Sequence, residues 1–313
     1  MEQKKVVVAL GHKALGTTLP EQMVAVKGAA RAVADLVEEG CLVAISHSNA
    51  PQVGMIHTAL NEFGKVHQDY TFAPMSVCSA MSQGYIGYDL QNAIREELLS
   101  RGILKTVATI ITQVVVDPYD EAFAEPIKVI GRYMTEEEAA AEEEKGNFVV
   151  EEEGKGFRRV VAAPKPKDIV EIDAVKALLD ADQVVIACGG GGIPVLKQRG
   201  GRLKGASAVI EKDYASGLLA EKLDADVLLF LTGQDKMAIN YGTPREKRLD
   251  VVTPDEVEEF ASQGQFPKAS ILPKMAAGAS FVSEREGRVA VIADLSKAKD
   301  ALYGKAGTVI KQA

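Results

Sequence analysis

The sequence predicts an α/β fold, an αβα sandwich with a central, mostly parallel sheet and a small protruding subdomain. Short β-branched apolar runs without polar alternation recur along the chain, and segments with helical spacing of apolar residues lie between them. An acidic stretch at about residues 117–160, poor in long apolar runs, interrupts this alternation and predicts the subdomain. Strand, helix and strand in this order favour a doubly wound sandwich with right-handed crossovers.

The elements follow from these patterns. The predicted strands are the apolar runs at residues 6–10, 42–45, 107–116, 184–188, 227–231 and 289–292. Runs that are apolar on both faces are typical of central parallel strands covered by helices. The predicted helices are residues 21–39, 83–101 and 173–182. Within the acidic stretch, the charge runs are interpreted as a solvated helix and a hairpin, with an excursion or lid as the alternative.

Composition limits the class of protein. The 313 residues are 47% hydrophobic and 26% charged, which is typical of globular proteins, and we assign them to a single domain. The net charge of -8 gives no reason to expect a nucleic-acid partner. The widely spaced Cys41, Cys78 and Cys188 are expected to be buried reduced thiols. The chain shows no signal peptide and no apolar run near the ~18 residues of a membrane span, so we expect a cytoplasmic protein without a membrane partner.

The polar residues that could carry chemistry follow the predicted strands, where open parallel sheets bind their ligands. Such segments occur at residues 11–16, 46–54, 189–194 and 232–236. The third contains four consecutive glycines, which would let backbone N–H groups approach a phosphate. A flexible turn is the alternative interpretation. The chain has neither a P-loop nor the glycine motif of protein kinases, so any nucleotide would be held by a different arrangement.

Lysines form the other candidate group. Lys212 lies beside Asp213, Lys274 follows a proline, and Lys128 lies in the acidic stretch. Phosphoryl transfer depends mainly on positioning and on neutralisation of charge, so lysines that converge on one point would suit it. Each lysine alone is most simply a surface residue, and the sequence does not show convergence.

Blocks along nearly the whole chain resemble carbamate kinase, of the amino acid kinase superfamily. The matching blocks are PQVG at 51–54, SQGYIGYDLQNAIREEL at 82–98, TQVVVD at 112–117, RRVVAAPKP at 158–166, GGGGIPV at 189–195, GASAVIEKDYAS at 205–216, INYG at 239–242 and LPK at 272–274. The resemblance implies reversible phosphoryl transfer between ATP and carbamate, giving ADP and carbamoyl phosphate with Mg²⁺. It also implies the family's αβα sandwich, a homodimer, the cytoplasm and a place in arginine metabolism.

The resemblance further assigns roles to residues. Residues 1–175, including the protruding subdomain, would form an acceptor-binding half, and residues 176–313 a nucleotide-binding half. The nucleotide and the transferring phosphoryl group would contact Gly189, Gly190, Gly191, Gly192, Lys212, Asp213, Tyr241 and Lys274. Lys128 would reach over the acceptor as a lid, and Asp213 would orient the lysines or the water shell of the metal. No side chain is assigned as a direct metal ligand.

The acceptor loops depart from the family pattern. Acceptor contacts are expected from Gly11, His12, Lys13, Ser48, Asn49 and Ala50. The family has Gly-Gly-Asn at the first loop and Thr-His-Gly-Asn-Gly at residues 46–50, so each lost glycine adds a Cβ near the expected phosphoryl site. His47 matches a family histidine and is interpreted as a structural, hydrogen-bonding residue.

Three hypotheses about activity stay open at this stage. His12 and Lys13 could have been recruited to bind the acceptor of a carbamate kinase, because both side chains can donate to an oxyanion. The same changes could instead suit a kinase for a different small carboxylate. In the third hypothesis His12 and Lys13 fill the acceptor pocket, and the protein is a catalytically impaired or repurposed nucleotide-binding homologue.

Overall fold

The computed structural model describes residues 3–67, 69 and 72–313. Its central sheet has eight strands in the order β15-β17-β16-β12-β1-β2-β9-β3. The strands are β1 (Lys5–Leu10), β2 (Leu42–His47), β3 (Val107–Thr109), β9 (Val184–Ile186), β12 (Val227–Thr232), β15 (Val251–Val252), β16 (Val289–Asp294) and β17 (Thr308–Ile310). Neighbours β12, β1, β2 and β9 are parallel, so their carboxyl ends meet at one edge of the sheet.

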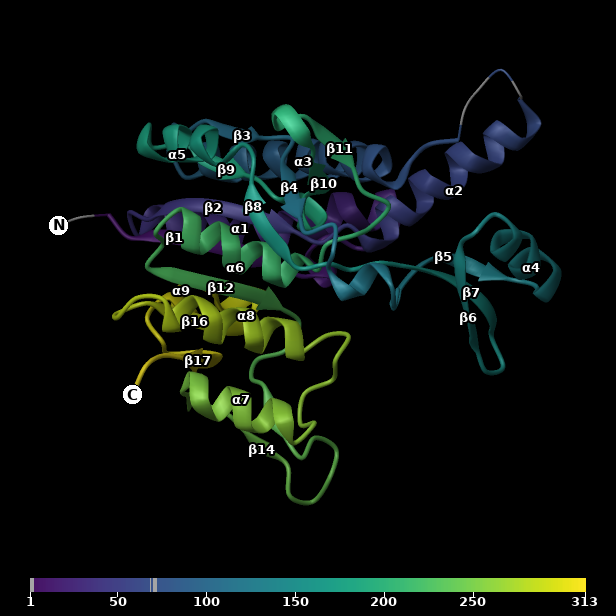
Figure 1. Ribbon diagram of the computed structural model, residues 1–313. Coiled ribbons are helices and arrows are strands. Elements are labelled where there is room, and N and C mark those ends of the chain that lie inside the picture. The colour runs from purple at the N-terminus through teal and green to yellow at the C-terminus, as the bar shows by residue number, and fades with distance from the viewer. Residues whose placement is uncertain (1–2, 68, 70–71) are drawn as a thin grey trace.

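Helices cover both faces of this sheet (Figure 1). The side chains of β1 alternate between two hydrophobic clusters, with Val7 and Ala9 in one and Val6 and Val8 in the other. The first cluster is completed by α5 (Ile172–Asp180), α6 (Lys212–Lys222), α7 (Pro254–Ser262) and α8 (Leu272–Ser283). The second is completed by α1 (Leu19–Glu38), α3 (Met75–Ser100) and α9 (Ala298–Leu302). The αβα sandwich with a mostly parallel sheet is therefore confirmed.

The prediction of one strand at residues 107–116 is wrong, because this segment forms two strands that belong to two different sheets. Only β3 joins the central sheet; β4 (Gln113–Val116) lies in a four-stranded sheet of order β11-β10-β4-β8, with β8 (Pro166–Ile169), β10 (Ile193–Lys197) and β11 (Leu203–Gly205). The chain turns at the buried Thr112, whose backbone exchanges hydrogen bonds with the Gln83 side chain at 2.9 and 3.1 Å. These distant contacts leave no trace in the local apolar pattern.

The acidic stretch folds as a helix and antiparallel strands that extend away from the main body (Figure 1). The strands β5 (Lys128–Met134), β6 (Phe148–Glu152) and β7 (Gly156–Val161) form a sheet of order β5-β7-β6, with α4 (Glu136–Glu144) between β5 and β6. We call this unit the protruding subdomain. It lies beside α2 (Ala50–Val66), a helix that the sequence analysis did not identify.

The remaining elements are short. They are the strand pair β13 (Ala238–Ile239) and β14 (Lys247–Arg248), and the 3₁₀ turns η1 (His12–Ala14), η2 (Glu121–Phe123), η3 (Gly189–Gly191), η4 (Arg199–Gly201) and η5 (Leu295–Lys297). All three cysteines are free and buried, as predicted. No helix in the described ranges is long and apolar enough to cross a membrane.

Candidate active site

Backbone hydrogen bonds join the loops that follow the parallel strands. Gly11 N–H donates to Leu231 O at 3.0 Å, and Ser48 N–H donates to Leu10 O at 3.1 Å. The start of the loop after β1 is therefore fixed to the end of β12, and the start of the loop after β2 to the end of β1. This is the edge at which the sequence placed its candidate residues.

The four glycines form a tightly packed turn beside the loop that follows β2. A Cβ at Gly190 would lie 2.0 Å from Asn49 Nδ2, and a Cβ at Gly191 would lie 2.3 Å from Ile210 O. Their φ angles of +66° and +93° also favour glycine. The N–H groups of Gly189 and Gly190 donate no backbone hydrogen bond within the described part of the chain. The turn is thus packed in place, and the N–H group of Gly190 is left to bind an anion.

A cavity of about 730 Å³ lies between the glycine turn, the start of α2 and the protruding subdomain. We call it the acceptor cavity. It brings together many of the residues singled out in the sequence, namely Ser48, Asn49, Ala50, Lys128, Gly190 and Lys212. It is also lined by Glu211 and Arg158, to which the sequence analysis gave no role.

Lys212, Asp213 and Lys274 form a chain of charges in which Lys212 and Asp213 are buried and Lys274 is partly buried. The Asp213 carboxylate accepts from the Lys212 ammonium and, at 2.8 Å, from Lys274 Nζ. Asp213 is 1% exposed, and burial lowers the pKa of Lys212. Burial alone would raise the pKa of Asp213, but the ammonium groups of Lys212 and Lys274 hold it below its ordinary value. The carboxylate is therefore ionised at neutral pH and holds two cations close together.

A smaller cavity of about 350 Å³ lies beyond the end of β12. Its lining includes Tyr241, Lys236, Ser270 and Ile271. Lys274 Nζ donates to Ser270 O at 2.9 Å, so the charge chain reaches from the acceptor cavity, at Lys212, to this second cavity. We call the second cavity the nucleotide cavity, following the role that the sequence assigned to Tyr241. The glycines at 189–192 lie on the acceptor side and do not line it.

His12 and Lys13 lie outside the acceptor cavity, as does Gly11. Both side chains belong to exposed residues; His12 Nε2 lies 3.4 Å from Thr17 Oγ1, and the Lys13 chain packs over Gly233, where a Cβ would lie 2.3 Å from Lys13 Cδ. The structure therefore does not show the filled acceptor pocket considered above. Lys13 instead stands at the end of β12, on the side of the nucleotide cavity that Gln234 lines.

His47 is completely buried beneath the site. Its Nδ1 lies 3.0 Å from Ser48 O, which can only accept, so Nδ1 carries the proton and donates. Burial lowers the pKa of His47 to about 4, so the ring is neutral at pH 7. Nε2 has no hydrogen-bond partner and lies under Gly189, where a Cβ would approach to 2.4 Å. These contacts are typical of a structural residue, which holds the loop after β2 against the glycine turn.

Some contributors to the site could not be assigned from the sequence. Lys128 pairs with Glu211, which ties the protruding subdomain to the start of α6. The Ser46 and Ser216 hydroxyls lie 2.6 Å apart and join β2 to α6 below the charge chain. The position of Glu211 directly before Lys212 and Asp213 could have marked it as a candidate site residue. Its pairing with Lys128 could not be predicted, because the two residues are 83 positions apart in the chain.

The geometry agrees with the comparisons to known proteins. The model of the amino acid kinase family matches residues 4–294. The chain belongs to the amino acid kinase family. Within it, the chain is 54% identical over 309 residues to carbamate kinase-like protein YqeA of Escherichia coli strain K12, covering 99% of each chain. It is 47% identical over 312 residues to carbamate kinase of Clostridium perfringens, covering 98% of this chain and 99% of the relative.

Solved structures of this family superpose closely on the chain. Carbamate kinase from Giardia lamblia bound to AMP-PNP matches with a TM-score of 0.93 and 36% sequence identity, over 99% of both chains. The chain is therefore a kinase, and the resemblance seen in the sequence blocks is confirmed over its full length.

Proposed function

We propose that this protein transfers a phosphoryl group reversibly between ATP and carbamate, forming ATP from carbamoyl phosphate and ADP in one direction. The observation that carries the proposal is the chain of Lys212, Asp213 and Lys274, which connects two cavities at the carboxyl edge of a parallel sheet. The names of the full-length relatives support carbamate as the acceptor, and the AMP-PNP bound to the Giardia enzyme supports a nucleotide as the other substrate.

Each cavity then has one task. Asn49, the N–H of Gly190 and Lys212 bind the acceptor's phosphoryl group, and the cavity with Tyr241 binds the nucleotide. The phosphoryl group passes between them beside the two ammonium groups, whose charge neutralises the oxygens in transit. Lys128, at the base of the protruding subdomain, closes over the acceptor. On this basis residues 1–175 supply most of the acceptor site and residues 176–313 the nucleotide site, with Gly190 and Lys212 of the second half also lining the acceptor cavity.

The residues present fit a Mg²⁺ ion that arrives with the nucleotide. In the described ranges, no group of three or more His, Cys, Asp or Glu side chains could hold a metal alone, and Mg²⁺ is commonly bound mainly by substrate phosphates and water. Both oxygens of Asp213 accept from lysines, so we propose that Asp213 orients the ammonium groups and does not replace the phosphates as ligands. When bound, the ion would neutralise charge on the nucleotide phosphates.

A coupled assay that detects ATP formed from carbamoyl phosphate, ADP and Mg²⁺ tests the function. The matched variants are Lys212→Met and Lys222→Met, the same change at the two ends of α6. Lys222 pairs with Asp168 at 3.0 Å, away from both cavities, so its loss should leave the rate within about twofold. Loss of Lys212 should lower kcat by about 100-fold or more. Folded wild-type protein that forms no ATP would exclude carbamate kinase activity, and ATP formed only from acetyl phosphate would indicate a different carboxylate.

We also propose that the protein is a homodimer. Along α3, Val77, Met81, Gly84 and Tyr88 repeat at helical spacing and are exposed, with Tyr88 68% exposed. A stripe of exposed apolar side chains on one helix is typical of a protein interface. The compartment we propose is the cytoplasm and the metabolic context arginine metabolism, because the family resemblance implies both.

A further inference from the structure

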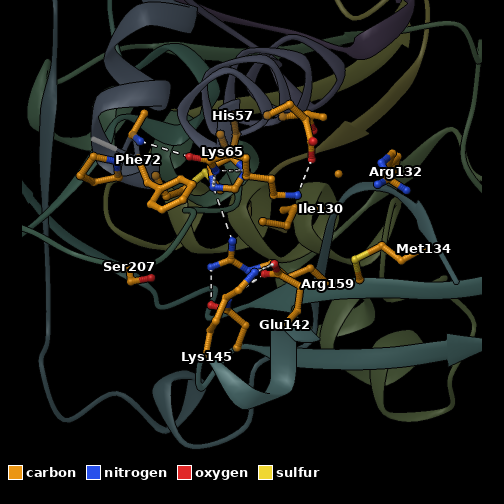
Figure 2. Close-up of a pocket in the computed structure, with 18 of the residues that line it drawn as sticks. His57, Lys65, Phe72, Ile130, Arg132, Met134, Glu142, Lys145, Arg159 and Ser207 are labelled. Atoms are coloured by element: carbon orange, nitrogen blue, oxygen red, sulfur yellow. Dashed lines mark hydrogen bonds and ion pairs between the residues drawn. The ribbon is translucent and has the colours of Figure 1, made fainter. Parts of the chain in front are cut away.

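A third cavity, of about 540 Å³, lies between α2 and the protruding subdomain (Figure 2). We call it the subdomain cavity. It shares Thr58 and residues 130–132 with the acceptor cavity but contains neither the glycine turn nor Lys212. It is therefore a separate space beside the proposed active site, and the proposed reaction gives it no role.

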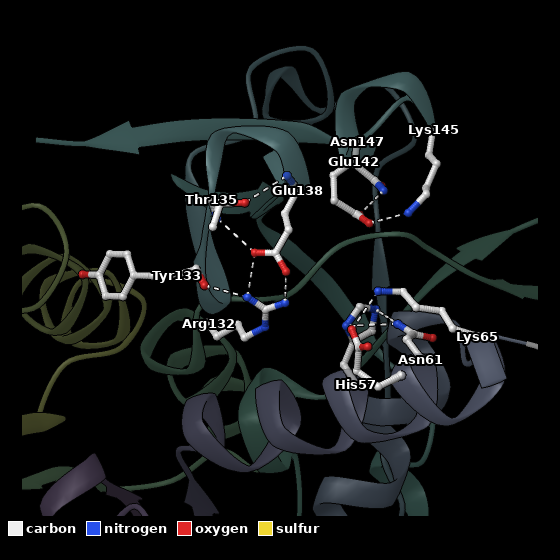
Figure 3. A network of polar contacts seen from close by, with 11 residues as sticks. His57, Asn61, Lys65, Arg132, Tyr133, Thr135, Glu138, Glu142, Lys145 and Asn147 are labelled. Carbon is white, nitrogen blue, oxygen red and sulfur yellow. Dashed lines mark hydrogen bonds and ion pairs between the residues drawn. The ribbon is translucent and has the colours of Figure 1, made fainter. Parts of the chain in front are cut away.

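The charges that line the subdomain cavity do not balance. Three cations are paired: Lys65 with Glu62 at 2.8 Å, Arg132 with Glu138 at 3.0 Å, and Lys145 with Glu142 at 2.7 Å (Figure 3). The fourth, Arg159, forms no ion pair in the described part of the chain. Four cations less three carboxylates leave one positive charge, with His57 counted as neutral.

Arg159 is held in place by polar contacts, and the Glu142 carboxylate interacts with it electrostatically without forming a direct ion pair. Nη2 donates to Asn147 Oδ1 at 2.6 Å, and Nη1 lies 3.5 Å from His57 Nε2 on α2 (Figure 2). Nε is buried and has no hydrogen-bond partner among the described residues. Burial lowers the pKa of Arg159, but a guanidinium stays charged at neutral pH. An unpaired half-buried guanidinium is costly unless an anion completes its hydrogen bonds.

Part of the remaining lining is apolar, beside polar residues such as Thr58, Asn61 and Ser207. Phe72, Met75, Ile130 and Met134 surround the space that Arg159 enters. Figure 2 shows Phe72 on the side of α2, whereas Ile130 and Met134 both belong to β5 of the protruding subdomain. A cavity of this size with a surplus of one positive charge and partly apolar walls matches a small organic anion.

We propose that the subdomain cavity binds an organic monocarboxylate with an apolar body, with its carboxylate on Arg159. The site is distinct from the proposed acceptor and nucleotide sites. Because a bound molecule would touch both α2 and β5, it would hold β5 against α2. That fixes Lys128, the first residue of β5, over the acceptor cavity, so binding lowers the KM for the acceptor.

Calorimetric titration of the full-length protein with 4-phenylbutyrate tests the binding step, which does not depend on the proposed reaction. The neutral amide 4-phenylbutyramide is the ligand control. Arg159→Gln should weaken 4-phenylbutyrate binding about tenfold or more, whereas Lys65→Gln, which removes the same charge from the same cavity, should change it less than about threefold. No binding by wild-type protein, equal binding of the amide, or equal losses in the two variants would overturn the proposal.

A second variant guards against misfolding of Arg159→Gln. Ala141 lies on the exposed α4 and lines the cavity, so Ala141→Trp should block it without touching Arg159 or the core. It should abolish 4-phenylbutyrate binding while thermal unfolding stays that of the wild type; retained binding would overturn the proposal. In the kinase assay, 4-phenylbutyrate should lower the KM for carbamoyl phosphate. Competitive inhibition would instead place the molecule in the acceptor cavity and contradict a separate site.

Discussion

At the scale of single residues, the site depends on a carboxylate that is buried between two lysines. Asp213 and Asp168 allow a comparison, because each pairs with two lysines. The Asp168 side chain is 36% exposed and the Asp213 side chain 2%. Water replaces the lost partner at an exposed site but cannot do so at a buried one. The same chemical change should therefore have different consequences at the two positions.

We expect Asp213→Asn to lower the free energy of unfolding by about 3 kcal/mol, because it leaves the buried ammonium group of Lys212 and the partly buried one of Lys274 without their counter-ion. Asp168→Asn, whose ion pairs are screened by solvent, should cost less than about 1 kcal/mol. Urea unfolding of both variants and the wild type measures the difference. Equal losses of unfolding free energy in the two variants would show that burial does not make the charge of Asp213 more important than that of Asp168.

His47 predicts a pH dependence of stability. Its folded pKa of about 4 lies below the ordinary 6.5, so between these values the unfolded state binds more protons than the folded state. Its contribution is therefore present above pH 6.5 and is lost as the pH falls toward 4, by an amount on the order of 3 kcal/mol. Urea unfolding of wild type and His47→Gln from pH 7 to pH 4 should show a smaller decline in the variant. Parallel declines would contradict the burial of a neutral ring.

At the scale of elements, the turn at residues 189–192 is set by close contacts as well as by backbone angles. Gly190 and Gly200 separate the two causes. Both have positive φ, at +66° and +79°, but a Cβ at Gly200 would meet nothing within 4 Å, whereas one at Gly190 would collide with Asn49. A side chain at position 190 would therefore displace a residue of the acceptor cavity, whereas one at position 200 would not.

We expect Gly190→Ala and Gly200→Ala to share a strain cost of about 1 to 2 kcal/mol. Gly190→Ala should in addition displace Asn49 and lower kcat/KM for carbamoyl phosphate by about tenfold or more. Gly200→Ala should leave kcat/KM unchanged. Chemical unfolding and steady-state kinetics on both variants check this, and a Gly190→Ala enzyme of normal activity would remove the glycine turn from the site.

Three helices start with the same local device. A capping box of threonine and glutamate opens α1 at Thr18, α4 at Thr135 and α7 at Thr253. Such signals are local and readable from sequence. By contrast, α3 begins at Met75 after a proline without a side-chain cap, and its predicted start at residue 83 was eight residues late.

At the scale of the whole molecule, the exposed stripe on α3 predicts the state of assembly. We expect light scattering to give the mass of a dimer for the wild type and of a monomer for Met81→Glu, because a buried unpaired charge would oppose association. Phe148→Glu, on the protruding subdomain, makes a similar change at a side chain of comparable exposure, 53% against 46%, and should leave the dimer intact. A monomeric wild type, or dimerisation of Met81→Glu, would contradict an interface on this face.

The amino-acid pattern by itself determined the fold class, the acidic subdomain, the buried cysteines and the strand ends at which chemistry was expected. These follow from local periodicity, because a strand buried on both faces must be apolar throughout. The tertiary structure alone decided that residues 107–116 serve two sheets and that Lys212, Asp213 and Lys274 converge. It also decided that His12 and Lys13 do not line the acceptor cavity. Such contacts join residues far apart in the chain. The direction of a side chain in a loop depends on neighbours from other parts of the chain, which a local sequence pattern does not reveal.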